Sequence, residues 1–132
     1  VSQVQDAAAS EAALTPMLFH IVLFRPRPDL TSADRASLVE ALEAALQRIP
    51  SIRRFHVGRR VVHGADYEAL MPVSLDYAAV IEFDDLAGLE EYLEHPAHQA
   101  LGSRFMSSLE SSVIFDYRMQ DGRALRSLAQ GE

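Results

Sequence analysis

Cysteine, tryptophan and lysine are all absent from this chain of 132 residues. Without cysteine, disulfide bonds, thiolate nucleophiles and cysteine-ligated metal sites are excluded. No apolar run in the sequence approaches the roughly 18 to 20 residues that cross a bilayer, so no membrane partner is expected. All twelve basic residues are arginine, and the net charge of -7 argues against a nucleic-acid partner. These features predict a soluble protein, and the cytoplasm is its expected location.

The hydrophobic content of 48% is enough for one globular domain with its own core. The start of the chain is polar and rich in alanine, and it lacks the basic residues and apolar run of a signal peptide. We therefore expect a flexible N-terminal extension at residues 1–16, one folded domain at residues 17–117 and a C-terminal tail at residues 118–132.

Strand-like and helix-like segments alternate along the domain. Runs of β-branched and aromatic residues predict four strands, at residues 17–24, 51–62, 75–83 and 111–117. Apolar residues at helical spacing and flanking prolines predict three helices, at residues 31–50, 84–95 and 96–109. This order predicts an α+β fold of ferredoxin-like type, with an antiparallel sheet and helices on one face. Gly58, inside the second strand, indicates either a β-bulge or a close approach of another backbone segment.

The first strand is apolar on both of its faces. One face carries Leu18, Val22 and Phe24, and the other carries Phe19, Ile21 and Leu23. The helices can cover only one face of a four-stranded sheet, and the other face would leave a large apolar patch in water. We therefore predict a two-fold homodimer in which two sheets meet face to face and form a dimeric α/β barrel.

Three stretches resemble the stress-responsive dimeric A/B barrel (Dabb) family: "FHIVLF" in the first strand, "YLEHPAH" at the junction of the last two helices, and "VIFDY" in the last strand. The resemblance covers residues 17–117 and implies a ferredoxin-like subunit in a dimeric barrel. Many members of the family have no assigned activity. Its olivetolic acid cyclase-like members close a ring by an aldol-type reaction, so the resemblance also implies a lyase or cyclase.

The resemblance to the cyclase implies roles for particular residues. Its catalytic tyrosine and histidine fall on Tyr92 and His98, and the histidine of its first strand falls on His20. A cyclase histidine in the third strand is replaced here by Tyr77. The second strand contains more arginine and the linker "HGADYEALMP" is longer, so a polyketide substrate does not follow from the resemblance.

The chemistry of these side chains permits two interpretations. A neutral His98 could remove a proton next to a carbonyl while the Tyr92 hydroxyl donates a hydrogen bond to the enolate, with no cofactor. Alternatively, Tyr92 and His98 stabilise the helix break by bonding backbone groups that the break frees. His95 lies one helical turn after Tyr92, where it either contacts the substrate or ends the helix. Two histidines without a third ligand do not predict a metal site.

Four further positions are candidates for binding. His20 shares a strand face with apolar side chains and is either a hydrogen-bonded core residue or part of a pocket. Phe24 and Tyr77 are expected to line the same pocket. Asp116 lies on the opposite face from its two aromatic neighbours, and we expect it to pair with an arginine or to fix a loop. The arginines of "IRRFHVGRR" either bind an acidic ligand or protect a strand edge from aggregation.

Three hypotheses about function follow. The first is a homodimer that binds a small carbonyl-containing molecule and acts on it as a lyase or cyclase that needs no cofactor. The second is a non-catalytic, stress-related homodimeric binding protein. The third, from analogy of fold, is a barrel monooxygenase, although the tryptophan expected in several such sites is absent.

Overall fold

The computed structural model describes residues 16–130. Four strands are present, namely β1 (Met17–Pro26), β2 (Arg54–Arg59), β3 (Tyr77–Phe83) and β4 (Leu109–Met119). Three α-helices are present, namely α2 (Ser32–Arg48), α3 (Leu86–Glu94) and α4 (Pro96–Ser108). Two 3-10 helices, η1 (Asp66–Leu70) and η2 (Gly122–Gln130), complete the described chain. None of the described helices is long and apolar enough to cross a membrane.

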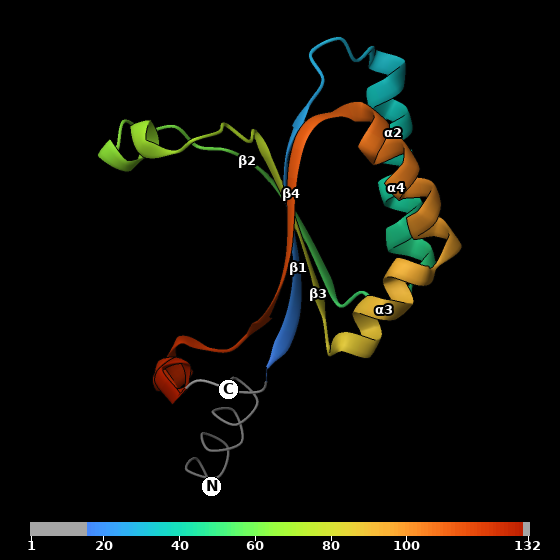
Figure 1. Ribbon diagram of the computed structural model, residues 1–132. Coiled ribbons are helices and arrows are strands. Elements are labelled where there is room, and N and C mark those ends of the chain that lie inside the picture. The colour runs from blue at the N-terminus through green and yellow to red at the C-terminus, as the bar shows by residue number, and fades with distance from the viewer. Residues whose placement is uncertain (1–15, 131–132) are drawn as a thin grey trace, which may run out of the picture.

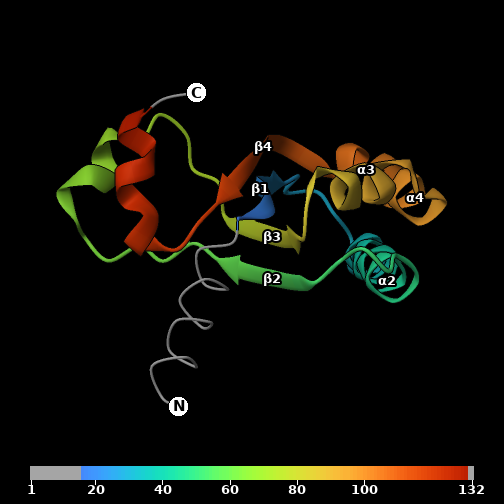
Figure 2. The ribbon, with the colours of Figure 1, turned by 90° about the horizontal axis from the view of Figure 1, so that it is seen from below.

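The sheet has the order β2-β3-β1-β4, and all of its neighbouring strands are antiparallel. The three α-helices cover one face of this sheet, and no helix of the described chain covers the other (Figures 1 and 2). The predicted ferredoxin-like architecture with helices on one face is therefore confirmed. We call the uncovered side of the sheet the open face.

Local signals in the sequence explain where the helices begin and end. The Thr31 hydroxyl accepts a hydrogen bond from the Asp34 amide at 3.1 Å, and the Asp34 carboxylate accepts one from the Thr31 amide at 3.0 Å. These two bonds satisfy amides that the start of α2 leaves free. Pro96 is the first residue of α4, where its missing N–H and its fixed φ angle are tolerated. The chain therefore stops one helix and starts the next within two residues.

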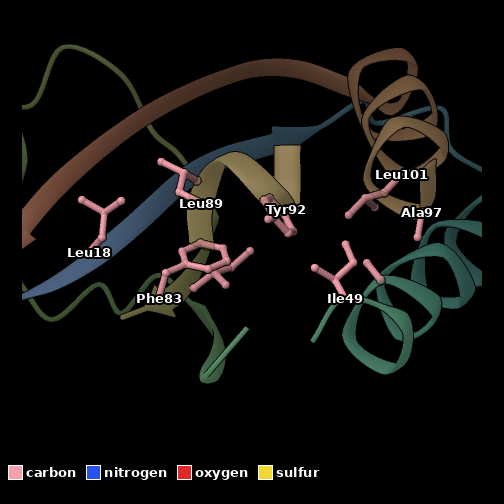
Figure 3. Packing of buried hydrophobic residues seen from close by; sticks show 9 residues of the cluster. Leu18, Ile49, Phe83, Leu89, Tyr92, Ala97 and Leu101 are labelled. Carbon is pink, nitrogen blue, oxygen red and sulfur yellow. The ribbon is translucent and has the colours of Figure 1, made fainter. Parts of the chain in front are cut away.

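The core lies between the sheet and the helices. Its buried apolar members, nine in all and seven of them labelled in Figure 3, come from β1, β3 and all three helices. Phe83 is fully buried and contacts the ring of Tyr92, with 5.3 Å between the ring centroids. Leu18 and Val22 point to the same side of β1 and are both buried, as its alternating pattern predicts.

The open face is apolar along β1 and along β4, the edge strand that pairs with it. Phe19 and Ile21 of β1 lie opposite Tyr117 and Phe115 of β4. Phe115 and Tyr117 are each about half exposed. At the β2 side of the same face, His56 and Glu82 form an ion pair with 2.7 Å between Nε2 and Oε2.

The structure differs from the sequence-based expectation in three details. β2 is shorter than predicted, and its pairing with β3 continues in register through Gly58, where the described chain places nothing within 4 Å of a Cβ position. Neither the bulge nor the close backbone approach expected at Gly58 is therefore present. The register shift lies instead at Arg25/Pro26, where proline has no N–H to donate to the ladder. The chain after residue 118 first completes β4 and then forms η2. The extension expected at the N-terminus lies outside the described residues, apart from Pro16.

The two leucines of α3 provide a test of this packing. Leu89 is 3% exposed and Leu86 is 50% exposed. We expect Leu89→Ala to lower the free energy of unfolding by about 2–5 kcal/mol, because it removes a core side chain and leaves a cavity. We expect Leu86→Ala to change it by less than about 0.5 kcal/mol. Urea unfolding followed by circular dichroism measures both, and equal effects would contradict the assignment of the core.

Candidate functional site

A cavity of about 180 Å³ lies between the sheet and the helices. Its polar lining consists of His20 from β1, Tyr92 from α3 and His98 from α4. Apolar side chains supply the remaining wall, among them Val22, Phe55, Leu101, Phe105 and Ile114. The three candidate residues, which are up to 78 positions apart in the sequence, therefore border one space.

Tyr92 occupies the centre of this polar group. Its ring centroid lies 5.6 Å from that of His20 and 4.4 Å from that of His98. Burial raises the pKa of Tyr92 to about 12, because the phenolate would lose its hydration. The phenol therefore keeps its proton at neutral pH and can donate it in a hydrogen bond. The hydrogen bonds found among residues 16–130 include none to this hydroxyl.

His98 is half-buried at the start of α4. Its Nδ1 lies 3.1 Å from the carbonyl oxygen of Leu93. A carbonyl can only accept a hydrogen bond, so Nδ1 carries the proton and Nε2 has a free lone pair. Burial lowers the pKa of His98, assisted by charge repulsion from His20 and opposed by the bond to Leu93. At neutral pH the side chain is thus a neutral imidazole with a basic Nε2.

A hydrogen bond within the sheet fixes the side chain of His20. Its Nδ1 lies 2.6 Å from Oδ1 of Asp116, which is its direct neighbour on β4. The carboxylate accepts this hydrogen bond, so the proton is on Nδ1 and the orientation of the ring is fixed. His20 is buried, whereas the Asp116 side chain is 42% exposed.

The break between α3 and α4 brings Tyr92 and His98 together. His95 has an extended backbone at this point, and its Nδ1 accepts a hydrogen bond from the amide of Ala97 at 3.0 Å. The two helices change direction here, so side chains of consecutive helices contact each other across the break. The structure places His95 in a capping role and does not include it among the residues that line the cavity.

Phe24 and Tyr77 lie beside the cavity and are not part of its lining. Their rings stack with 5.6 Å between centroids, and Phe24 also contacts the edge of Phe105 at 4.8 Å. Through Phe105 they support the wall of the cavity. Tyr77 borders a separate, more open hollow of about 420 Å³ that also contains Arg25 and Arg35.

The expectation for Asp116 is wrong. The sequence predicts that Asp116 pairs with an arginine or fixes a loop, whereas the structure shows a hydrogen bond between Asp116 and His20. Strand alternation places Asp116 on the face opposite to Phe115 and Tyr117, which is the face of His20 once β1 and β4 are paired. The pairing of these two strands is the missing information, because the two residues are 96 positions apart.

The fold and this cavity together define a class: a ferredoxin-like α+β subunit with a small His/Tyr-lined space between sheet and helices. The sequence matches the family described as the Stress responsive A/B Barrel Domain (Dabb) over residues 18–119, and the chain belongs to this family. An uncharacterised protein of Streptomyces coelicolor is 31% identical over 103 residues, which are 76% of this chain and 98% of that protein.

Two further comparisons concern proteins with a named activity. Olivetolic acid cyclase of Cannabis sativa is 23% identical over 100 residues, which are 74% of this chain and 92% of the cyclase. The hydroxynitrile lyase of Passiflora edulis has a similar structure, with a TM-score of 0.69 and 15% identity over 80% of this chain and 95% of the lyase.

A third similar structure is that of a dimeric ferredoxin-like protein of Thermobifida fusca. It has a TM-score of 0.61 and 23% identity over 79% of this chain and 92% of the Thermobifida fusca chain.

The protonation of His98 can be tested directly. Its pKa is lowered in the folded protein, so the unfolded chain binds the proton more readily. The contribution of His98 to stability is therefore fully present above its unfolded pKa of about 6.5 and is lost as the pH falls from there through the folded pKa. We expect an NMR titration of the imidazole C–H signals to give a midpoint below about 6.5 for His98, assigned by its loss in His98→Asn. A midpoint above that value would contradict the assigned environment.

Proposed function

We propose that this protein catalyses proton transfer on a small carbonyl-containing molecule, as a lyase or cyclase of aldol type that uses no cofactor. The observation that supports this proposal best is that His98 and Tyr92 line the same cavity. A base and a hydrogen-bond donor that face the same space are the minimum requirement for enolate chemistry.

The reaction begins when Nε2 of His98 removes a proton from the carbon next to the substrate carbonyl. The C–H electron pair moves into the carbonyl group and forms an enolate, whose oxygen accepts a hydrogen bond from the Tyr92 hydroxyl. The enolate carbon then attacks a second carbonyl carbon, which forms a C–C bond and an alkoxide. The alkoxide takes the proton back from His98. The reverse sequence of the same steps cleaves a C–C bond.

His20 has a supporting role in this mechanism. Its ring contacts that of Tyr92, and its Nδ1–H is committed to the Asp116 carboxylate. Its Nε2 is therefore the atom left to accept or donate a hydrogen bond toward the cavity. We assign to His20 the orientation of the substrate oxygen beside Tyr92.

The size and lining of the cavity favour a compact, mostly apolar substrate. A volume of about 180 Å³ is below the range of about 300–1,000 Å³ that is typical of sites for drug-sized ligands. Of the two proteins with a named activity described above, the one of similar sequence is a cyclase and the one of similar fold is a lyase, which agrees with the proposed class of reaction.

We further propose that the protein works as a homodimer formed through the open face. The apolar side chains of β1 and β4 on this face lack a covering helix within the described chain. Related structures from Thermobifida fusca and Bacteroides fragilis are described as dimeric. A second copy would bury an apolar face against an identical one, as two-fold symmetry requires.

We expect the protein to be located in the cytoplasm.

A non-catalytic binding protein is the second candidate, and two hydrogen bonds favour it. The bond from His98 to the Leu93 carbonyl and the capping bond of His95 both satisfy backbone groups at the helix break. On this hypothesis residues 92–98 serve folding, and the cavity binds a ligand without acting on it.

One substitution at His98 and one at Tyr92 separate the two candidates. Asparagine places an N–H near the position of Nδ1 and has no counterpart of Nε2, so His98→Asn keeps the structural hydrogen bond and loses the base. We expect it to reduce exchange of the α-protons of an acetoacetyl thioester in D2O at least 100-fold, as followed by 1H NMR. Tyr92→Phe should reduce the rate by roughly 100-fold through loss of the donor.

The control for this assay is Gln99→Ala, because Gln99 is exposed on α4 next to His98 and does not line the cavity. It should retain the wild-type rate. An unchanged rate in His98→Asn would remove the proposed mechanism. Absence of exchange activity in the wild type, together with a melting temperature that is lower in His98→Ala than in His98→Asn, would favour the binding protein.

The dimer is tested by placing a charge on the open face. We expect Phe115→Asp to produce monomers in sedimentation velocity, because a buried carboxylate without a partner is strongly unfavourable in an apolar interface. Val39→Asp is the matched control, since Val39 is also about half exposed but lies on α2, on the helix side of the molecule. Dissociation by both variants, or by neither, would contradict the assigned interface.

A further inference from the structure

The connection between β2 and β3 projects from the sheet as an arm, which we define as residues 60–76. It contains η1 and stands away from the sheet on the side of the open face, opposite the helices (Figures 1 and 2). The cavity and its polar residues lie on the other side of the sheet. The arm is therefore not accounted for by the proposed active site.

The arm is internally ordered by its own hydrogen bonds. At its base, the amide of Arg60 donates to the Asp76 carbonyl at 2.8 Å, and the Arg60 guanidinium donates to the Ser74 hydroxyl at 2.7 Å. At its tip, the Glu68 carboxylate accepts hydrogen bonds from the amides of His63 and Gly64. Gly64 has a φ of 87°, a value that favours glycine. The arm thus has a defined shape rather than that of a free loop.

Apolar side chains of the arm are nevertheless in water. Their exposed fractions lie between 45% and 76%, and the residues are Val61, Val62, Tyr67, Leu70, Met71 and Val73. Every hydrogen bond that the structure gives to residues 61–73 stays within that segment. An ordered segment that exposes several apolar side chains and makes no hydrogen bond to the rest of the described chain is typical of an interaction site.

We propose that the arm docks on the second copy of this chain and forms part of the dimer interface. The inference rests on the homodimer proposed above. Sheets that pack face to face lie about 10 Å apart. The six residues 60–65 that lead to η1 can span at most about 20 Å. An arm of this length on the side of the open face can therefore reach past the plane of the partner's sheet and contact its edge.

A second copy is the occupant that the geometry favours. The arm and the apolar open face lie on the same side of the molecule, so any chain that covers the face also meets the arm. Under two-fold symmetry each subunit contributes one arm to its partner. Two arms are therefore buried per dimer, which doubles the apolar area that a single arm would add to the interface. The two arms would then add contacts at the edges of the sheets, outside the contact between the two open faces.

The first test is a double substitution at the exposed end of η1. We expect Leu70→Ser with Met71→Ser to raise the dimer dissociation constant at least about tenfold, because two apolar side chains per subunit lose their buried environment. Leu86→Ser is the matched control, since Leu86 is about half exposed on α3, on the opposite side of the sheet. It should change the constant less than about twofold.

Sedimentation equilibrium of the full chain measures these constants, and circular dichroism verifies that each variant is folded. A dimeric wild type with an unchanged constant in the double variant would overturn the arm contact and leave the dimer through the open face intact. A monomeric wild type would overturn both proposals.

The absence of tryptophan allows a second, independent test. In Leu70→Trp, the emission of a single tryptophan reports on the arm alone. We expect the emission to shift to shorter wavelength as the protein concentration passes through the range in which the dimer forms. Emission typical of water-exposed indole in the dimer would overturn the proposal, as would a blue-shifted emission that does not depend on concentration, because the arm would then be packing on its own subunit.

Discussion

The break between α3 and α4 is the constraint on which the candidate site depends. Pro96 cannot extend the preceding helix, so the chain ends one helix and begins another beside it. A continuous helix would place Tyr92 and His98 almost two turns apart along one axis. The break instead brings their ring centroids to 4.4 Å and directs both toward the sheet, where His20 already lies. The contact between the two rings is therefore a consequence of backbone geometry.

The second constraint is the apolar character of β1 on both faces. This strand lies in the interior of the sheet, paired with β3 on one side and β4 on the other. Its helix face contributes His20 to the cavity, and its open face requires a cover that the described chain does not provide. The proposed site and the proposed interface between subunits thus share one strand, so a substitution that shifts β1 is expected to affect both sides of the sheet.

The sequence predicts the fold well because its signals are local. Alternation with a period of two separates Val22 from Leu23, and Pro50 and Pro96 limit the helices, so neither step requires knowledge of distant residues. The pairing of β1 with β4 is not local, and for that reason the contact between His20 and Asp116 could not be derived. The ordered tip of the arm was also missed, because it depends on the Glu68 carboxylate reaching back to two amides in what composition describes only as a loop.

The structural and the chemical interpretations of His98 concern different atoms of the same ring. The carbonyl of Leu93 needs a donor because the helix that would have supplied one ends at the break, and Nδ1–H provides it. This bond decides the tautomer, and the tautomer leaves the lone pair on Nε2. Burial then favours the neutral ring, which is the form that can accept a proton. The residue that completes the helix break thus also presents a neutral imidazole in contact with the Tyr92 ring, which is the arrangement that the proposed mechanism requires.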